Sequence, residues 1–165
     1  MTVLQNKKRL FIILNTILVI IWCGTIFYFS AQTAENSGSQ SFPISKGILG
    51  AVDKLQGKSV PDQVLNTEAR AFDENVRESA HSFLFFILAM FVVNLLRLLR
   101  VFGWKAFFIT IIFCAVYSLS DEIHQLFVPG RAFQLIDLTL DFIGAVLGLV
   151  IFMGVKRCIV SWSKG

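Results

Sequence analysis

The chain has 165 residues, of which 55% are hydrophobic and only 16% are charged. Soluble domains are usually ~25% charged and ~45–50% apolar, so this composition excludes an ordinary water-soluble domain, and also a disordered chain. The net charge is +4, but the Lys and Arg residues stand in short groups between apolar runs, so we expect no nucleic-acid partner. The sequence predicts an integral membrane protein.

Four apolar runs are long enough to cross a bilayer, whose core of about 30 Å needs about 20 helical residues. They cover 10–30, 79–96, 104–121 and 134–155, and none shows the alternation typical of a strand. The predicted fold is therefore all-α, a bundle of four transmembrane helices. The first run is too long for a cleaved signal peptide and is interpreted as an uncleaved anchor.

The distribution of Lys and Arg predicts the orientation of this bundle. Basic residues without any Asp or Glu flank the runs on one side, at 1–9, 97–105 and 156–165. All 11 acidic residues fall on the other side. Residues 1–9 and 156–165 are thus predicted to be cytoplasmic tails of a membrane domain at 10–155, with 31–76 and 121–136 outside.

The long outer segment, 31–76, is predicted to be partly helical. A helix beginning at Ser41-Phe42-Pro43 would place Ile44, Ile48, Val52 and Leu55 on one face, as in a helix lying on the membrane surface. Residues 57–61 break that helix, and from about residue 67 a second one is predicted to continue into the next span. An ordinary tethering loop remains the alternative.

Polar residues concentrate at the predicted outer ends of the spans, where ionisable groups need a partner, a wet cavity or a function. Several lie one helical turn apart and so share a helix face. They are Arg77 with His81, Asp121 with His124 and Gln125, and Asp137 with Asp141; Glu122 and Arg131 lie beside them. These nine residues are predicted to form one outward-facing ligand site.

The same residues also suit a structural ion-pair network, in which His81 bonds Asp121 and Arg131 neutralises Asp137 or Asp141. A metal site is disfavoured because no His-Glu-x-x-His spacing occurs, and a serine hydrolase because no Gly-x-Ser-x-Gly elbow occurs. We expect no metal and no cofactor. Cys23, Cys114 and Cys158 suggest no disulfide framework. Gly144 and Gly148 form a Gly-x-x-x-Gly pair, which favours close helix packing.

Four motifs together resemble the VanZ-like family of small bacterial membrane proteins, over about residues 10–155. The motifs are Trp22-x-x-x-Ile26-Phe27-x-Phe29-Ser30-x-Gln32, Arg77-x-x-x-His81, Asp121-Glu122-Ile123-His124-Gln125-x-Phe127-x-Pro129-Gly130-Arg131 and Asp137-x-x-x-Asp141-x-x-Gly144-x-x-x-Gly148. The block at 121–131 is the most specific of them. The chain departs from the family pattern at Glu78 and at Leu84-Phe85, where members often have Lys and Glu-Tyr.

The resemblance implies a plasma-membrane protein linked to reduced susceptibility to teicoplanin-type glycopeptide and lipoglycopeptide antibiotics, without supplying a mechanism. One hypothesis is a non-catalytic pocket for a lipid head group or lipid-linked wall precursor, with arginines gripping phosphate. A second is an enzyme acting on a lipid-linked phosphate ester, with His81 or His124 as acid or base and Asp121 or Glu122 orienting it. A transporter using Asp137 and Asp141 is the third. The oligomeric state is left open.

Overall fold

The computed structural model describes the backbone of residues 2–162 and the side chains of residues 5–155. The side chains of the predicted C-terminal tail, Lys156, Arg157, Cys158 and Lys164 among them, lie outside the described residues.

Five helices make up the described chain, and no strand occurs within residues 2–162. They are α1 (Thr2–Ser30), α2 (Ala34–Leu55), α3 (Asp62–Leu98), α4 (Gly103–Gln125) and α5 (Leu135–Trp162). All except α2 are long and apolar enough to cross a membrane. The prediction of an all-α, four-span protein with a helical segment between the first two spans is confirmed.

The helices extend beyond the apolar runs from which they were predicted. The largest extension is in α3, whose 37 residues would measure about 55 Å, well over the thickness of a bilayer core. Its first part, from Asp62, is the helix that was expected to begin near residue 67 and to continue into the second span.

The predicted start of the outer helix, at Ser41-Phe42-Pro43, is wrong. The helix α2 begins at Ala34, where the Thr33 side chain accepts a hydrogen bond from the Asn36 backbone N–H (3.2 Å), and Pro43 lies inside it. A proline interrupts one helical hydrogen bond, so such a helix needs support from packing. Here the hydroxyls of Ser41 and Ser45, on either side of Pro43, donate to Asp73 of α3 at 2.8 and 2.7 Å.

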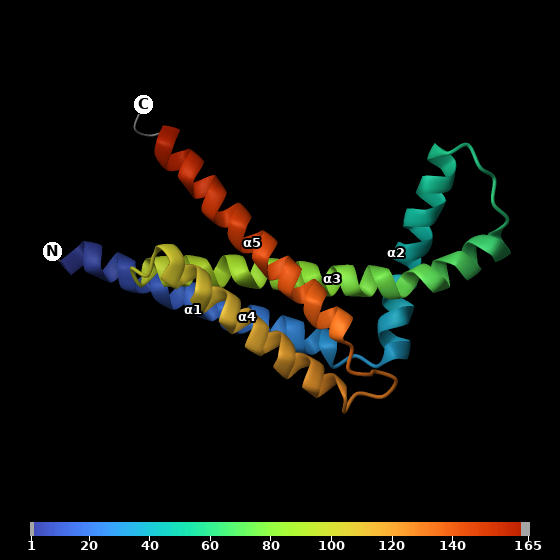
Figure 1. Cartoon of the computed structure of the whole chain (residues 1–165), viewed down its shortest axis with the longest axis horizontal. Helices are drawn as coiled ribbons and strands as arrows, with labels where there is room; N and C mark the ends of the chain where they lie inside the picture. The colour runs from blue at the N-terminus through green and yellow to red at the C-terminus, as the bar shows by residue number, and fades with distance from the viewer. Residues whose placement is uncertain (1, 163–165) are drawn as a thin grey trace.

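The helix α2 lies across α3 rather than along it (Figure 1). Four apolar side chains of α2 are exposed: Ile44, Ile48, Val52 and Leu55. This is the arrangement of an amphipathic helix whose apolar face meets a membrane surface.

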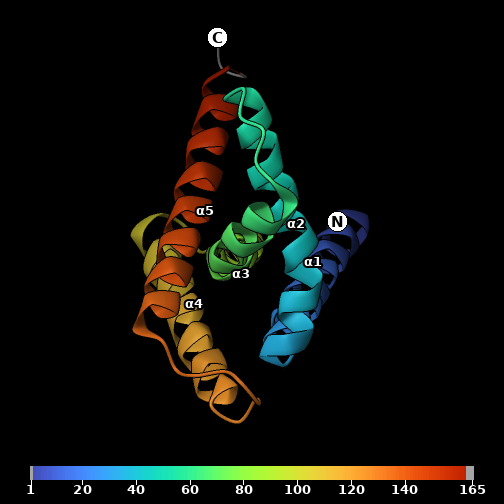
Figure 2. The ribbon, with the colours of Figure 1, turned by 90° about the vertical axis from the view of Figure 1, so that its right-hand side faces the viewer.

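The central element is α3, which packs against all four other helices. Figure 2 looks nearly along α3, with α4 and α5 on one side and α1 and α2 on the other. The core around it includes Ile26, Phe85, Leu88 and Ala145, all fully buried. The indole N–H of Trp22 donates to the Leu84 carbonyl oxygen (2.8 Å), which ties α1 to α3.

Helix α5 approaches α3 more closely than a side chain would allow. A Cβ on Gly144 would overlap the carbonyl oxygen of Ser82, and one on Gly148 would overlap that of Phe86. Small residues four apart let two helix backbones meet in this way. The contact matters for the site because α5 also carries Asp137 and Asp141.

Candidate functional site

A cavity of about 440 Å³ lies where five segments of the chain meet. The C-terminal ends of α1 and α4, the N-terminal ends of α2 and α5, and the middle of α3 come together there (Figure 1). Its polar lining includes Ser30, Gln32, Glu74, Arg77, Glu78, His81, Gln125, Arg131, Gln134, Asp137 and Asp141. Its apolar lining includes Phe29, Ile44, Val76, Ala80, Phe83 and Leu84.

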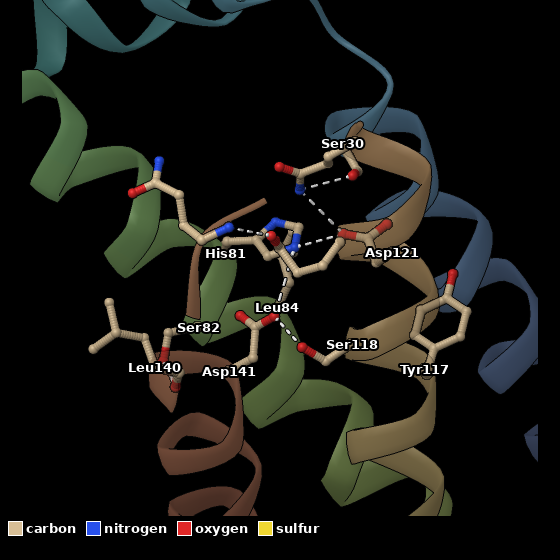
Figure 3. A network of polar contacts seen from close by, with 12 residues as sticks. Ser30, His81, Ser82, Leu84, Tyr117, Ser118, Asp121, Leu140 and Asp141 are labelled. Carbon is tan, nitrogen blue, oxygen red and sulfur yellow. Dashed lines mark hydrogen bonds and ion pairs between the residues drawn. The ribbon is translucent and has the colours of Figure 1, made fainter. Parts of the chain in front are cut away.

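His81 of α3 lies in the wall of the cavity, between two aspartates from neighbouring helices. Its Nε2 lies 3.0 Å from Asp121 Oδ2 on α4 and 3.9 Å from Asp141 Oδ2 on α5 (Figure 3). Both carboxylates are almost fully buried, and Ser118 donates to Asp141 Oδ2 at 2.7 Å. Two acidic partners on one imidazole fix the orientation of the ring.

The side-chain amide of Gln125 connects this group to the first span. It donates to Ser30 Oγ at the end of α1 (3.0 Å) and, more weakly, to Asp121 Oδ2 (3.4 Å). Polar side chains from all four spans are therefore linked to each other. Such networks specify one arrangement of the helices.

Glu122 is buried behind the cavity and does not line it. Its Oε2 accepts from the backbone N–H of Gln134, 3.1 Å away, immediately before α5. This carboxylate thus satisfies a donor at the start of α5, where negative charge is favourable. The other oxygen, Oε1, is buried without a partner.

The loop between α4 and α5 carries Arg131 to the cavity. Gly130 takes a positive φ of 76°, which favours glycine, and the Ala34 backbone N–H donates to the Pro129 carbonyl oxygen (3.4 Å). Arg131 Nε donates to the Gln32 carbonyl oxygen (3.3 Å). Burial, and secondly the charge of Arg77, lower the pKa of Arg131 from its ordinary value. An arginine nevertheless remains a cation in proteins.

Of the nine predicted ligand-site residues, the structure brings six to the cavity lining: Arg77, His81, Gln125, Arg131, Asp137 and Asp141. Asp121 and Glu122 lie directly behind it. His124 lies apart, with its ring against that of Phe27 (centroids 4.3 Å apart) and its Nδ1 without a partner. Gln125 lines the cavity, and its side-chain amide contacts Ser30 Oγ and Asp121 Oδ2.

Several lining or supporting residues were missed by the sequence analysis. Glu74 and Glu78 belong to the same face of α3 as Arg77 and His81, and this spacing could have indicated them. Ser118 lies one turn before Asp121 and could have been found in the same way.

Neither ion pair expected for Arg131 forms. Asp137 and Asp141 were the expected partners. Within residues 5–155, no nitrogen of Arg131 lies within 4.0 Å of either carboxylate. The contact between His81 and Asp121, expected in the same network, is present.

The polar side chains of the site are bonded largely to one another. Within the described side chains, no three His, Cys, Asp or Glu residues lie close enough together to hold a metal ion. The Ser82 hydroxyl donates to the Leu140 carbonyl oxygen (2.7 Å) and so joins α3 to α5. The Ser30 hydroxyl accepts from the Gln125 amide.

Comparison with known proteins gives one match. A family model described as VanZ/LLP1 matches residues 15–159. No curated protein matches the chain. No solved structure matches it either.

Proposed function

The chain belongs to the VanZ/LLP1 family, and from this premise we propose that its cavity binds a lipid head group or a lipid-linked cell-wall precursor at the outer face of the bacterial plasma membrane. By holding such a molecule, the protein lowers the access of teicoplanin-type glycopeptides and lipoglycopeptides to their target. The result is low-level resistance, without chemical change of the bound molecule.

The observation that carries this proposal is the mixed lining of the cavity. The lining includes Arg77 and Arg131, and guanidinium groups suit phosphate because they offer several N–H donors in a planar fork. It also includes apolar side chains, among them Ile44 and Phe83, which are 57% and 60% exposed. A ligand with a charged head and an attached hydrocarbon chain suits both kinds of lining.

The outward orientation rests on the basic residues that flank the spans. Lys7, Lys8 and Arg9 precede α1, and Arg97, Arg100 and Lys105 surround the turn between α3 and α4. Short loops rich in Lys and Arg stay in the cytoplasm. The cavity lies at the opposite ends of α1 and α4 and at the middle of α3, away from the basic end of that helix, so it faces the cell wall, and both termini are cytoplasmic.

The test removes one guanidinium. Arg131→Ala should lower the teicoplanin inhibitory concentration and the amount of lipid or precursor that co-purifies with the protein, at unchanged membrane abundance. The control is Lys58→Ala, which removes a positive charge from an exposed outer loop and should change neither quantity. Unchanged retention of lipid and precursor in Arg131→Ala would reject the proposal.

A second candidate function is catalytic, and the contact between His81 and Asp121 favours it. Asp121 would fix the tautomer of His81, which would act as general acid or base on a lipid-linked phosphate ester, while Arg77 and Arg131 stabilised phosphoryl charge. In that case His81→Gln should abolish a mass change in the lipid substrate while sparing binding. Identical lipid and precursor masses with and without the protein would exclude catalysis.

A further inference from the structure

Five of the charged side chains that line the cavity are half-buried or exposed: Arg77, Arg131, Glu74, Glu78 and Asp137. We call them the rim. Three carboxylates and two guanidiniums thus converge on one space. Charged groups at the edge of a membrane usually neutralise each other at short range.

The rim residues do not neutralise each other in this way. In the part of the chain with described side chains, no ion pair within 4.0 Å joins any two of them. Arg131 donates to a backbone carbonyl, and Glu74 accepts from the Gln134 side-chain amide at 3.4 Å. Both signs of charge are therefore held apart around an open space.

Two rim atoms are also buried without any hydrogen-bond partner, Arg77 Nε and Asp137 Oδ1. Buried polar atoms in folded proteins nearly always have a partner. Here one is a donor and the other an acceptor. A bound molecule that satisfied both would have to present an acceptor and a donor in the same head group.

A purely anionic phosphate would neutralise the two arginines, but it would add to the negative charge of the three carboxylates. A phosphate that carries a primary ammonium balances both sets. The ammonium has three N–H donors and no acceptor, and its hydrogen bonds to carboxylates are charge-assisted.

We infer that the cavity selects a zwitterionic head group, with a phosphate at Arg77 and Arg131 and a primary ammonium at Glu78 and Asp137. This inference rests on the proposed binding of a lipid-linked molecule and narrows the chemical class of that molecule. It also assigns Glu78, at which the chain departs from its family's pattern, a direct contact with the ligand.

The experiment titrates the detergent-purified full chain with single lipids and counts bound molecules by native mass spectrometry. Phosphatidylethanolamine supplies a phosphate with an ammonium, and phosphatidylglycerol supplies a phosphate with hydroxyls. We expect phosphatidylethanolamine to bind about tenfold more tightly, the factor that one additional charge-assisted hydrogen bond contributes.

The variants Glu78→Gln and Asp137→Asn should each reduce that preference severalfold, because each removes one carboxylate from the position of the ammonium. Glu68→Gln removes a carboxylate from an exposed position of α3 and serves as the matched control, with the preference unchanged. The affinities of the unmodified protein for the two lipids already test the inference, so the inference stays testable even if a variant fails to fold.

The outcomes separate this inference from the proposed function. Equal binding of the two lipids would overturn the zwitterion inference and leave lipid binding intact, whereas retention of neither lipid would overturn the inference and leave only a lipid-linked wall precursor as the proposed ligand. Free phosphoethanolamine is the third arm. Displacement of lipid by equal concentrations of it would support recognition of the head group and contradict a role for the apolar lining.

Discussion

The Nε2 atom of His81 lies 3.0 Å from the Oδ2 atom of Asp121, so a hydrogen bond joins α3 to α4 across 40 positions of the chain. The Asp121 side chain is only 2% exposed and that of His81 17%. The pair therefore lies inside the bundle, and it determines how the wall of the cavity is held.

Loss of either partner should leave the other buried and unsatisfied. We expect His81→Ala and Asp121→Ala each to lower the free energy of unfolding, and the double variant to lose less than the sum of the two. Couplings between polar side chains in membrane proteins average roughly 0.6 kcal/mol and reach about 1.7 kcal/mol, and a value near 1 kcal/mol is expected here. Reversible unfolding in bicelles measures it.

His124 provides the matched control for this cycle, because it lies on α4 near Asp121 but packs against Phe27. His124→Ala combined with His81→Ala should be additive. If the losses in unfolding free energy of His81→Ala and Asp121→Ala were additive as well, the hydrogen bond between these residues would contribute nothing specific to stability.

The two histidines should also differ in function. His81 lines the cavity and His124 does not, so His81→Ala should lose the proposed teicoplanin resistance at normal membrane abundance, whereas His124→Ala should keep most of it. Inhibitory concentrations and immunoblots of membranes measure the two quantities. Loss of resistance in His124→Ala alone would contradict the assignment of the site to the cavity.

The crossing of α5 over α3 should tolerate no additional atoms at its closest point. Gly144→Ala would force a methyl group against the Ser82 carbonyl, and overpacking of this kind costs about 1–3 kcal/mol. Gly154→Ala is the control, since nothing lies within 4 Å of a Cβ at that position of the same helix. Thermal unfolding in detergent should therefore show a lower midpoint for Gly144→Ala only. Equal midpoints would mean that the two helices separate without cost.

The sequence was sufficient for the spans, because length and hydropathy alone distinguish a helix that can cross a membrane. It was insufficient for the start of α2. Proline is common in the first turn of a helix, so Pro43 was interpreted as marking the helix start, whereas it lies inside α2. The helix is supported on both sides of Pro43 by a tertiary contact, in which Asp73 of α3 accepts hydrogen bonds from two serine hydroxyls of α2. Local sequence patterns contain no information about that contact.

For the candidate site, helical spacing predicted which residues share a face of one helix, but not which faces of different helices meet. It placed Asp137 and Asp141 on one face of α5, and both line the cavity. It could not distinguish the directions of His124 and Gln125 without knowing which neighbour α4 meets. The hydrogen bond between Gln125 and Ser30 joins residues that are 95 positions apart in the chain, and it depends on the packing of α1.

The predicted orientation can be tested by labelling single cysteines in a variant that lacks Cys23, Cys114 and Cys158. A cysteine at Lys58, in the exposed loop after α2, should react with a membrane-impermeant maleimide added to intact cells stripped of wall. A cysteine at Arg100, in the exposed turn between α3 and α4, should react only after the membrane is opened. The reverse pattern would place the cavity in the cytoplasm.

The position of α2 should depend on Asp73, which accepts from Ser41 and Ser45 and so holds one wall of the cavity against α3. Asp73→Ala leaves both hydroxyls without this partner, and amide hydrogen exchange across residues 34–55 should accelerate about tenfold, while α1 exchanges as before. Glu68→Ala, at an exposed position of the same helix, is the control and should leave exchange unchanged. Because Ser41 and Ile44 line the cavity, lipid retention should fall with Asp73→Ala. Unchanged exchange in α2 would mean that its apolar contacts alone hold it in place.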